Sequence, residues 1–311
     1  MTATAERPVD ADRRRDTELA EGRLTNRDTG RRVKETTFQA VIMGSTGLGL
    51  LVLGWLLVDV TLTGAPRLEP SFLTDIPSRR PTAAGAGIAL LGTLWLMALT
   101  AAIAIPLSIG AALYLEELAP RGKVWSKITK VIEINISNLA GVPSIIYGIL
   151  AFLLFGRILG LGNSLLTGAI ALALLVSPVI IVAARESLKA VPPSVREGAY
   201  ALGGTRQQTL WRATVPPAIG GMVTGCILAL SRAIGEAAPL LLAGALAFTA
   251  VYPDSPNSPA SALPIQIFNW TSRPQGDFQN TAAAGILVLL GILLTMNAIA
   301  VFIRNRSQVS W

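Results

Sequence analysis

The 311-residue sequence contains no histidine and a single cysteine, Cys226. Without an imidazole, the chain cannot carry out Ser-His or Cys-His nucleophilic catalysis or ligate a metal through histidine. One thiol cannot form an internal disulfide framework or a multi-cysteine zinc or iron–sulfur site. A Walker-type lysine loop is also missing from the sequence. We therefore expect no catalytic residue, no metal site and no cofactor in this chain.

Charged residues are also scarce, at 14% of the sequence against 51% apolar residues. This is about half the charged fraction of a typical soluble domain. The charges leave six apolar windows, each long enough to cross ~30 Å of hydrocarbon as a helix. The ~10-residue alternation of transmembrane strands is absent. The sequence predicts an all-α, polytopic membrane domain over residues 38–306, with six transmembrane helices at about 38–60, 86–115, 134–156, 164–184, 217–248 and 280–303.

Lysine and arginine are unevenly distributed between the connecting segments. Twenty of the 26 fall on the side that holds both termini, five fall on the opposite side, and Arg232 lies within a span. Because cationic segments are retained in the cytoplasm, both termini are predicted to be cytoplasmic in a multi-pass protein of the cell membrane. Residues 1–37 carry nine basic and eight acidic side chains with almost nothing apolar, which predicts a disordered cytoplasmic tail.

The cytoplasmic segment 190–216, between the fourth and fifth spans, is rich in helix signals. Ser194 and Glu197 fit a capping box that starts a short helix. The glycine pair at 203–204 ends it, because glycine tolerates the left-handed conformation at a helix C-terminus. Thr205 can cap a second short helix. The pattern predicts two amphipathic helices joined by a glycine elbow, which either project from the membrane or lie along the lipid headgroups.

The order of residues in this segment resembles a known signature. Glu197-Gly198-Ala199, followed after three residues by Gly203 and after nine more by Ala-Thr-Val-Pro at 213–216, resembles the E-A-A-x-x-x-G-x9-I-x-L-P pattern of ABC importer permeases. In that family the segment docks into a cleft of the cytoplasmic ATPase, so we call residues 190–216 the coupling loop. Gly198 departs from the alanine of the pattern and should weaken its helix by about 1 kcal/mol. The resemblance assigns ATPase coupling to Glu197, Gly198, Ala199, Tyr200, Leu202, Gly203 and Arg206.

Four further segments resemble phosphate-specific permeases: YLEELAP at 114–120, GVPSIIYG at 141–148, RAIGEAAPLL at 232–241 and FNWTSRP at 268–274. The last resembles the A-type subunit more than its C-type partner. This resemblance implies a type I importer fold and a permease for inorganic phosphate. It also implies a related C-type second permease, a dimeric cytoplasmic ATPase that binds ATP and Mg, and an extracytoplasmic phosphate-binding protein. Membrane lipid is a further expected partner, and no nucleic acid is expected.

Arg232 and Glu236 are the ionisable residues of the otherwise apolar region 213–253. A guanidinium within the membrane costs at least ~2.5 kcal/mol on insertion scales, so Arg232 should face protein or water. Its planar fork suits a phosphate oxyanion through paired, charge-assisted hydrogen bonds. Because Glu236 follows at i+4, the two side chains either neutralise each other within the bundle or also meet the substrate. Both are candidate residues of the substrate pathway.

Ser144 and Tyr147 are two further pathway candidates, in the third span after Pro143, which should interrupt the helix. Their three-residue spacing places both hydroxyls on one helix face, where they either hydrogen-bond a passing oxyanion or satisfy a neighbouring helix. Small residues that recur every four positions in the fifth span allow close approach of a helix, in the second permease or within this subunit. They are Gly221, Gly225, Ala229, Ala233 and Ala237.

Energy for transport must come from a partner, since the chain lacks a nucleotide-binding loop. The implied mechanism is alternating access, in which closure of the ATPase on ATP pushes residues 195–212, rotates the attached spans and opens the gate outward to accept phosphate. Hydrolysis then resets the gate. The alternatives are an importer of the same kind for another oxyanion or small solute, and an ion-coupled secondary carrier, which often shows inverted repeats.

Overall fold

A computed structural model of the chain describes residues 9–120, 122–243, 249–259 and 261–307. Within these ranges the regular secondary structure is helical, apart from one antiparallel bridge between Ser164 and Pro259. Among the described residues, five helices are long and apolar enough to cross a membrane, and a bent pair of helices counts as a sixth span if taken together. The predicted all-α class with up to six membrane helices is therefore confirmed.

The N-terminal helix α1 (Val9–Gly64) belongs largely to a unit of its own, which extends to Asp59. It contains no proline, and its charged first half is rich in arginine, which favours helix. Residues 9–37 are accordingly helical, where the sequence predicted a disordered tail, and residues 1–8 of that prediction lie outside the described residues. The apolar stretch of α1 matches the first predicted span.

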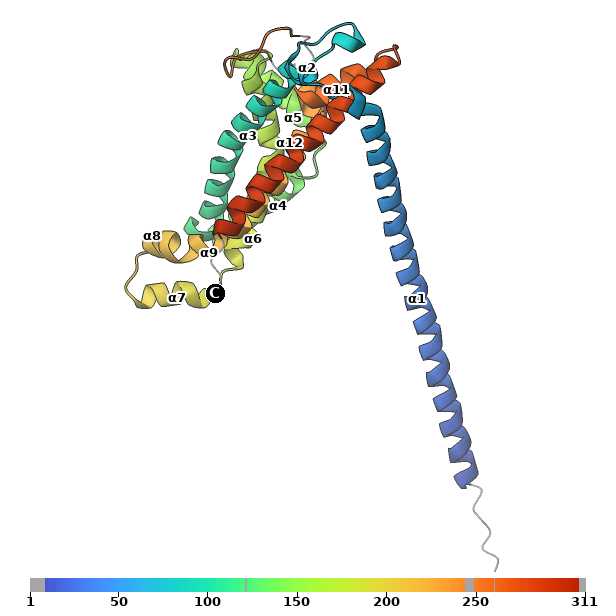
Figure 1. The fold of residues 1–311 in the computed structure, drawn as a ribbon. Coiled ribbons are helices and arrows are strands. Elements are labelled where there is room, and N and C mark those ends of the chain that lie inside the picture. The colour runs from blue at the N-terminus through green and yellow to red at the C-terminus, as the bar shows by residue number, and fades with distance from the viewer. Residues whose placement is uncertain (1–8, 121, 244–248, 260, 308–311) are drawn as a thin grey trace, which may run out of the picture. The chain divides into compact units, whose positions relative to one another are not determined.

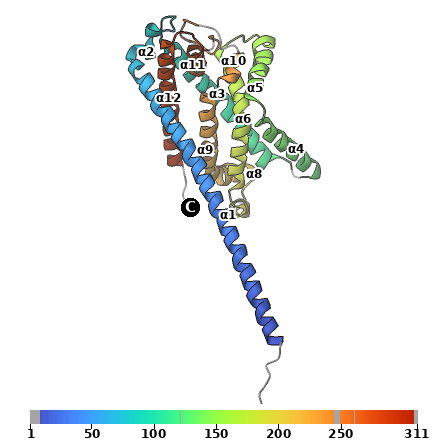
Figure 2. The same ribbon diagram turned by 90° about the vertical axis from the view of Figure 1, so that its right-hand side faces the viewer.

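The second unit, from Val60 onward, is a bundle centred on α6 (Leu165–Lys189). This helix packs against both α3 (Gly87–Leu113) and α9 (Val215–Ile234), and α9 also packs against α12 (Asp277–Ser307), as Figures 1 and 2 show. More than half of the most apolar stretch of α6 is buried inside this unit. The bundle therefore has a core of its own.

Small residues permit the close packing of α9 on α6. Gly221 and Gly225 lie directly against Ser187 and Ala183 of α6, where an added Cβ atom would clash. Since lipid tails are as apolar as the helices, such close packing of small residues is a main source of helix association in a membrane. The ridge of small residues on the fifth span therefore serves packing within this subunit at these two positions.

The third predicted span is a bent pair of helices. α4 (Lys123–Leu139) and α5 (Ser144–Ala151) are bent by 103° at the break between them. Pro143 has no N–H to donate and disfavours a helical conformation in the residue before it, so the predicted interruption is confirmed. The span predicted at 134–156 therefore contains this break, and α5 continues as a π-helical turn, η4 (Phe152–Ile158).

The fifth predicted span, 217–248, is also interrupted. α9 ends at Ile234, and a short helix, α10 (Ala238–Leu242), follows after a turn. Pro239 lies at the second position of α10 and cannot donate the backbone hydrogen bond that a continuous helix would need. Residues 244–248 of the predicted span lie outside the described residues.

Short helices gather at the end of the bundle opposite the coupling loop (Figure 1). They are η1 (Ala65–Arg67), α2 (Pro70–Thr74), η2 (Pro81–Ala83) and α11 (Leu263–Thr271). Trp270 of α11 is fully buried there beside Phe72, with 5.8 Å between their ring centroids, and Phe278 joins the same cluster. The FNWTSRP segment therefore supplies an aromatic anchor for this end of the fold.

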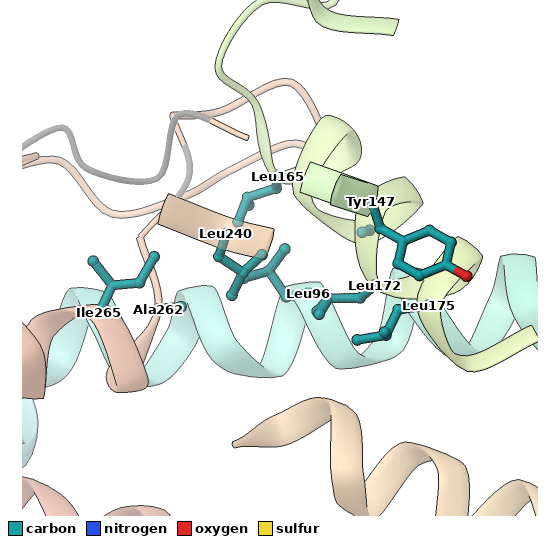
Figure 3. Close-up of a cluster of buried hydrophobic side chains, with 9 residues drawn as sticks. Leu96, Tyr147, Leu165, Leu172, Leu175, Leu240, Ala262 and Ile265 are labelled. Carbon is teal, nitrogen blue, oxygen red and sulfur yellow. The ribbon is translucent and has the colours of Figure 1, made fainter. Parts of the chain in front are cut away.

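A second buried cluster joins α3, α5, α6, α10 and α11 (Figure 3). Its large side chains interdigitate where the two broken spans meet the continuous helices. They are Leu96, Tyr147, Leu165, Leu172, Leu175, Leu240 and Ile265. The broken segments are thereby fixed to the continuous part of the bundle.

Candidate functional site

The coupling loop forms two short helices that project from one end of the bundle (Figure 1). The first, α7 (Pro193–Ala201), begins after Pro192, which makes no side-chain cap. The capping box predicted for Ser194 and Glu197 is therefore wrong. Pro193 occupies the first helical position instead, where its fixed φ suits a helix start and its missing N–H leaves no helical hydrogen bond unmade.

The residues after α7 behave as predicted. Gly203 adopts a left-handed conformation with φ +82° and ends the helix. Thr205 caps α8 (Arg206–Thr209), because its hydroxyl accepts from the Gln208 N–H at 3.3 Å while the Gln208 side chain accepts from the Thr205 N–H at 2.9 Å. A π-helical turn, η5 (Leu210–Thr214), then connects α8 to α9 without a break. A displacement of α8 would therefore pass directly into the fifth span.

The residues assigned to ATPase coupling lie at or beside the exposed tip of this loop. Leu202 is 91% exposed and Tyr200 is 44% exposed. Ala199 is half-buried, and its carbonyl accepts from the Gly204 N–H at 3.0 Å. Exposed large apolar side chains on a projecting tip are typical of a surface that another protein covers. The remaining four, Glu197, Gly198, Gly203 and Arg206, are also exposed.

A single carboxylate residue attaches this loop to the end of α3. The Arg196 guanidinium lies 2.7 Å from Oε1 of Glu117, which belongs to the π-helical turn η3 (Tyr114–Leu118) after α3. Arg196 also donates to the carbonyls of Leu188 and Val191, both at 2.8 Å. Arg206 donates to the carbonyl of the same Glu117. α7 and α8 are therefore tied to η3 as well as to α6 and α9.

A buried arginine ties three spans together at the same end. Arg185 of α6 is 7% exposed, and its guanidinium lies 3.2 Å from a carboxylate oxygen of Glu116 and 3.2 Å from one of Glu133 on α4. Lys189 is the second cation near Glu133, at 3.7 Å. A buried guanidinium needs such partners, because an unpaired charge would bear the full desolvation cost. Sequence reasoning expected Glu116 and Glu117 to be solvated or paired with Arg121 or Lys123, and it did not predict their pairing with Arg185 and Arg196.

The pathway candidates Arg232 and Glu236 form an ion pair with 3.3 Å between Nε and Oε1. Arg232 lies in the last turn of α9, where a cation is favoured by the helix dipole. Its side chain is 54% exposed, against 21% for Glu236. The neutralisation that was one of the two alternatives is therefore present, and about half of the Arg232 side chain remains exposed, where a further anion or a neighbouring subunit can reach it.

The other two candidates lie on α5, which packs against α10 just after Glu236. Ser144 begins α5 and is half-buried. Tyr147 is 5% exposed, and its hydroxyl donates to the Leu139 carbonyl at 2.6 Å (Figure 3 shows the ring within the apolar cluster). This bond crosses the bend between α4 and α5. The structure thus brings Tyr147 into a packing role and brings the elements of all four candidates to one region.

Replacing Tyr147 by phenylalanine is expected to weaken the bend without removing the ring from the core. The Leu139 carbonyl keeps the hydrogen bond from the Val142 N–H at 3.1 Å, so only the bond from the hydroxyl is lost, at a cost on the order of 1 kcal/mol. We expect a small decrease in the midpoint of thermal unfolding, measured on purified protein in detergent, and near-normal transport. A loss of transport at unchanged stability would instead assign the hydroxyl to the substrate.

The bundle is apolar, carries an exposed loop at one end and holds the Arg232–Glu236 ion pair at the break of its fifth span. These are features of a membrane transport subunit. No group of three or more acidic or cysteine side chains suited to a metal ion occurs in the described part of the chain. The chain belongs to the family of binding-protein-dependent transport system inner membrane components, whose family model matches residues 104–308.

Individual relatives cover nearly the whole chain. The chain is 32% identical over 275 residues to the probable ABC transporter permease protein YqgI of Bacillus subtilis, covering 83% of this chain and 92% of the relative. It is 31% identical over 299 residues to the phosphate transport system permease protein PstA of Yersinia pestis, covering 94% and 97%. Among solved structures, an inward-facing MetNI methionine ABC transporter matches with a TM-score of 0.57 at 16% identity, covering 71% of this chain and 97% of that one. The chain has the type I ABC importer permease fold.

Proposed function

We propose that this chain is the membrane-spanning subunit of an ATP-driven importer for inorganic phosphate, and that the coupling loop docks into a cytoplasmic ATPase. The observation that carries the proposal is the exposed apolar tip at Leu202, on a loop that continues directly into the span ending at Arg232. The cargo is inferred from the likeness to PstA of Yersinia pestis over 94% of the chain. The end of the bundle that carries the coupling loop then lies in the cytoplasm, as do both termini.

The contacts of the coupling loop indicate how motion of the ATPase reaches the membrane spans, a route that we call the force path. When the ATPases close on ATP, they move α7 and α8 together, because both hold Glu117 of η3. Motion of η3 is transmitted to α3, while η5 carries the motion of α8 into α9. Arg185 links α6 and α4 to the end of α3, so four spans respond as one assembly. ATP and Mg are bound by the ATPase in this scheme.

The Arg232–Glu236 pair supplies the contact with substrate. A phosphate oxyanion that approaches the exposed side chain of Arg232 competes with Glu236, and two parallel hydrogen bonds from the planar guanidinium favour the anion. Ser144 is a second donor within the same region. A C-type permease of related sequence covers the exposed face of Arg232 in the assembled transporter, and an extracytoplasmic binding protein delivers phosphate.

Uptake of radiolabelled phosphate into vesicles that contain the reconstituted transporter tests this function. We expect uptake that requires ATP and the ATPase and that is reduced little by sulfate or molybdate. Strong competition by either oxyanion would reassign the cargo while keeping the mechanism. Uptake driven by an ion gradient in the absence of the ATPase would identify a secondary carrier and contradict the proposal.

A further inference from the structure

A cavity lies beside the coupling loop, and the lysines that line it take no part in the function proposed above. It has a volume of about 880 Å³ and is bordered by the polar face of α4, by η3 and by Arg206 of α8. This volume falls within the range of about 300–1,000 Å³ that is typical of ligand sites. The cavity is therefore large enough for a polar headgroup.

Three lysines of α4 line this cavity: Lys123, Lys127 and Lys130. Their spacing of four and three residues places them on one helix face. All three side chains are exposed, and none forms an ion pair with the residues that the structure describes. A row of three available ammonium groups on one face is a feature that recognises a phosphate-bearing group.

The carboxylates that line the cavity are already neutralised by other cations. Glu116 pairs with Arg185, and Glu117 pairs with Arg196. Glu133 lies between Arg185 and Lys189, at 3.2 and 3.7 Å. These carboxylates are therefore not counter-ions for the three lysines, and the cavity has an excess of positive charge.

The opposite face of α4 is apolar and exposed. Its large side chains are Val124, Trp125, Ile128, Val131 and Ile132, which are 39–69% exposed. Figure 2 shows α4 projecting from the side of the bundle. A helix with lysines on one face and aliphatic and tryptophan side chains on the other is typical of one that lies in a membrane interface.

We propose that the cavity binds the headgroup of an anionic phospholipid, with Lys123, Lys127 and Lys130 as the donors to its phosphate, while the apolar face of α4 rests in the acyl region. The same phosphate chemistry would admit the free ion. The apolar face beside the cations favours the lipid, because it places the lysines at headgroup depth. The choice of the cytoplasmic leaflet rests on the orientation proposed above.

The test uses the complete transporter in detergent and two acyl-chain spin-labelled probes, phosphatidylglycerol and phosphatidylcholine. Electron paramagnetic resonance measures the fraction of each lipid that the protein immobilises. We expect a preference for phosphatidylglycerol that falls by roughly tenfold or more in the triple variant K123Q/K127Q/K130Q, since each lysine near an anionic headgroup contributes to binding. The charge-retaining variant K123R/K127R/K130R should keep the preference, which separates lost charge from lost folding.

The matched control is R79Q/R80Q/R157Q, which removes three exposed cations at the opposite end of the bundle. An unchanged preference in the glutamine triple variant, or an equal loss in this control, would overturn the proposal. Displacement of labelled phosphatidylglycerol by inorganic phosphate would assign the site to the free ion instead. A photo-cross-linker attached at Lys127→Cys that captures the ATPase in place of lipid would assign the cavity to a protein contact. Cys226 is buried and should not compete for the label.

Lipid preference in detergent depends neither on transport nor on orientation. A transporter that takes up phosphate with ATP but shows no preference would retain the proposed function and lose the lipid site. A transporter that prefers phosphatidylglycerol through these lysines but fails the uptake measurement would retain the lipid site and lose the proposed function.

Discussion

Replacing Arg232 by alanine should abolish ATP-driven phosphate uptake while the transporter still assembles and hydrolyses ATP. The Arg232 side chain is 54% exposed, so its truncation leaves no cavity in the core and the fold should persist. Truncating one partner of a charge-assisted pair with substrate costs about 2–5 kcal/mol, which corresponds to a decrease in uptake of roughly thirtyfold or more. Radiolabelled phosphate uptake in vesicles, normalised to the amount of assembled complex, measures the effect.

Two further variants separate a role in transport from a role in packing. Arg232→Lys keeps the charge but loses the planar fork, so its uptake should fall between wild type and alanine. Glu236→Gln removes the internal counter-ion, and it should change uptake without preventing assembly. Normal uptake by a well-expressed Arg232→Ala variant would remove Arg232 from the pathway, and failure of Glu236→Gln to assemble would favour a purely structural pair.

Replacing Leu202 by glutamate should release the ATPase from the membrane subunit and stop uptake. Leu202 is 91% exposed at the tip of the coupling loop, so an added charge costs the isolated subunit little. In a docked interface the same charge would be buried without a partner, at a cost of several kcal/mol. Copurification of the ATPase with the tagged membrane subunit measures docking directly.

The matched control for this variant is Val251→Glu, which places the same charge at a 71% exposed apolar side chain outside the coupling loop. This control should retain the ATPase in full. If the Leu202→Glu variant copurifies as much ATPase as wild type, the tip at Leu202 does not dock and the force path must begin elsewhere in the chain.

The class of fold was predictable because hydrocarbon imposes a strong constraint on composition. A helix that crosses ~30 Å of lipid needs about 20 apolar residues in a row, and the charge-free windows of the sequence show these directly. Bends are not recorded in such windows. The third predicted span is uncharged across Pro143, and the fifth is apolar around Gly235 apart from Arg232 and Glu236, so hydropathy alone predicts each as one continuous helix. Backbone restrictions at proline determine where each span breaks.

The local structure of the coupling loop was predictable in part from near neighbours, although the capping box expected at Ser194 and Glu197 is replaced by a helix start at Pro193. Gly203 and Thr205 act through residues within five positions, and both behave as the sequence indicates. The attachments of the loop were not predictable. Arg196 and Glu117 are 79 residues apart, and Arg185 and Glu116 are 69 apart, so their pairing requires the packed bundle. Tyr147 likewise meets Leu139 because of the 103° bend.

The contact between Gly148 and Pro239 restricts where a passage through the membrane can form. A Cβ atom at Gly148 would overlap the backbone of Pro239, so α5 and α10 touch main chain to main chain. No channel can run between two backbones in direct contact. If phosphate passes Arg232 as proposed above, its route avoids the contact between α5 and α10 and follows the exposed side of Arg232, where the proposed second permease would supply the facing wall. The substrate pathway would then lie at the interface between the two permeases and would form only when they assemble.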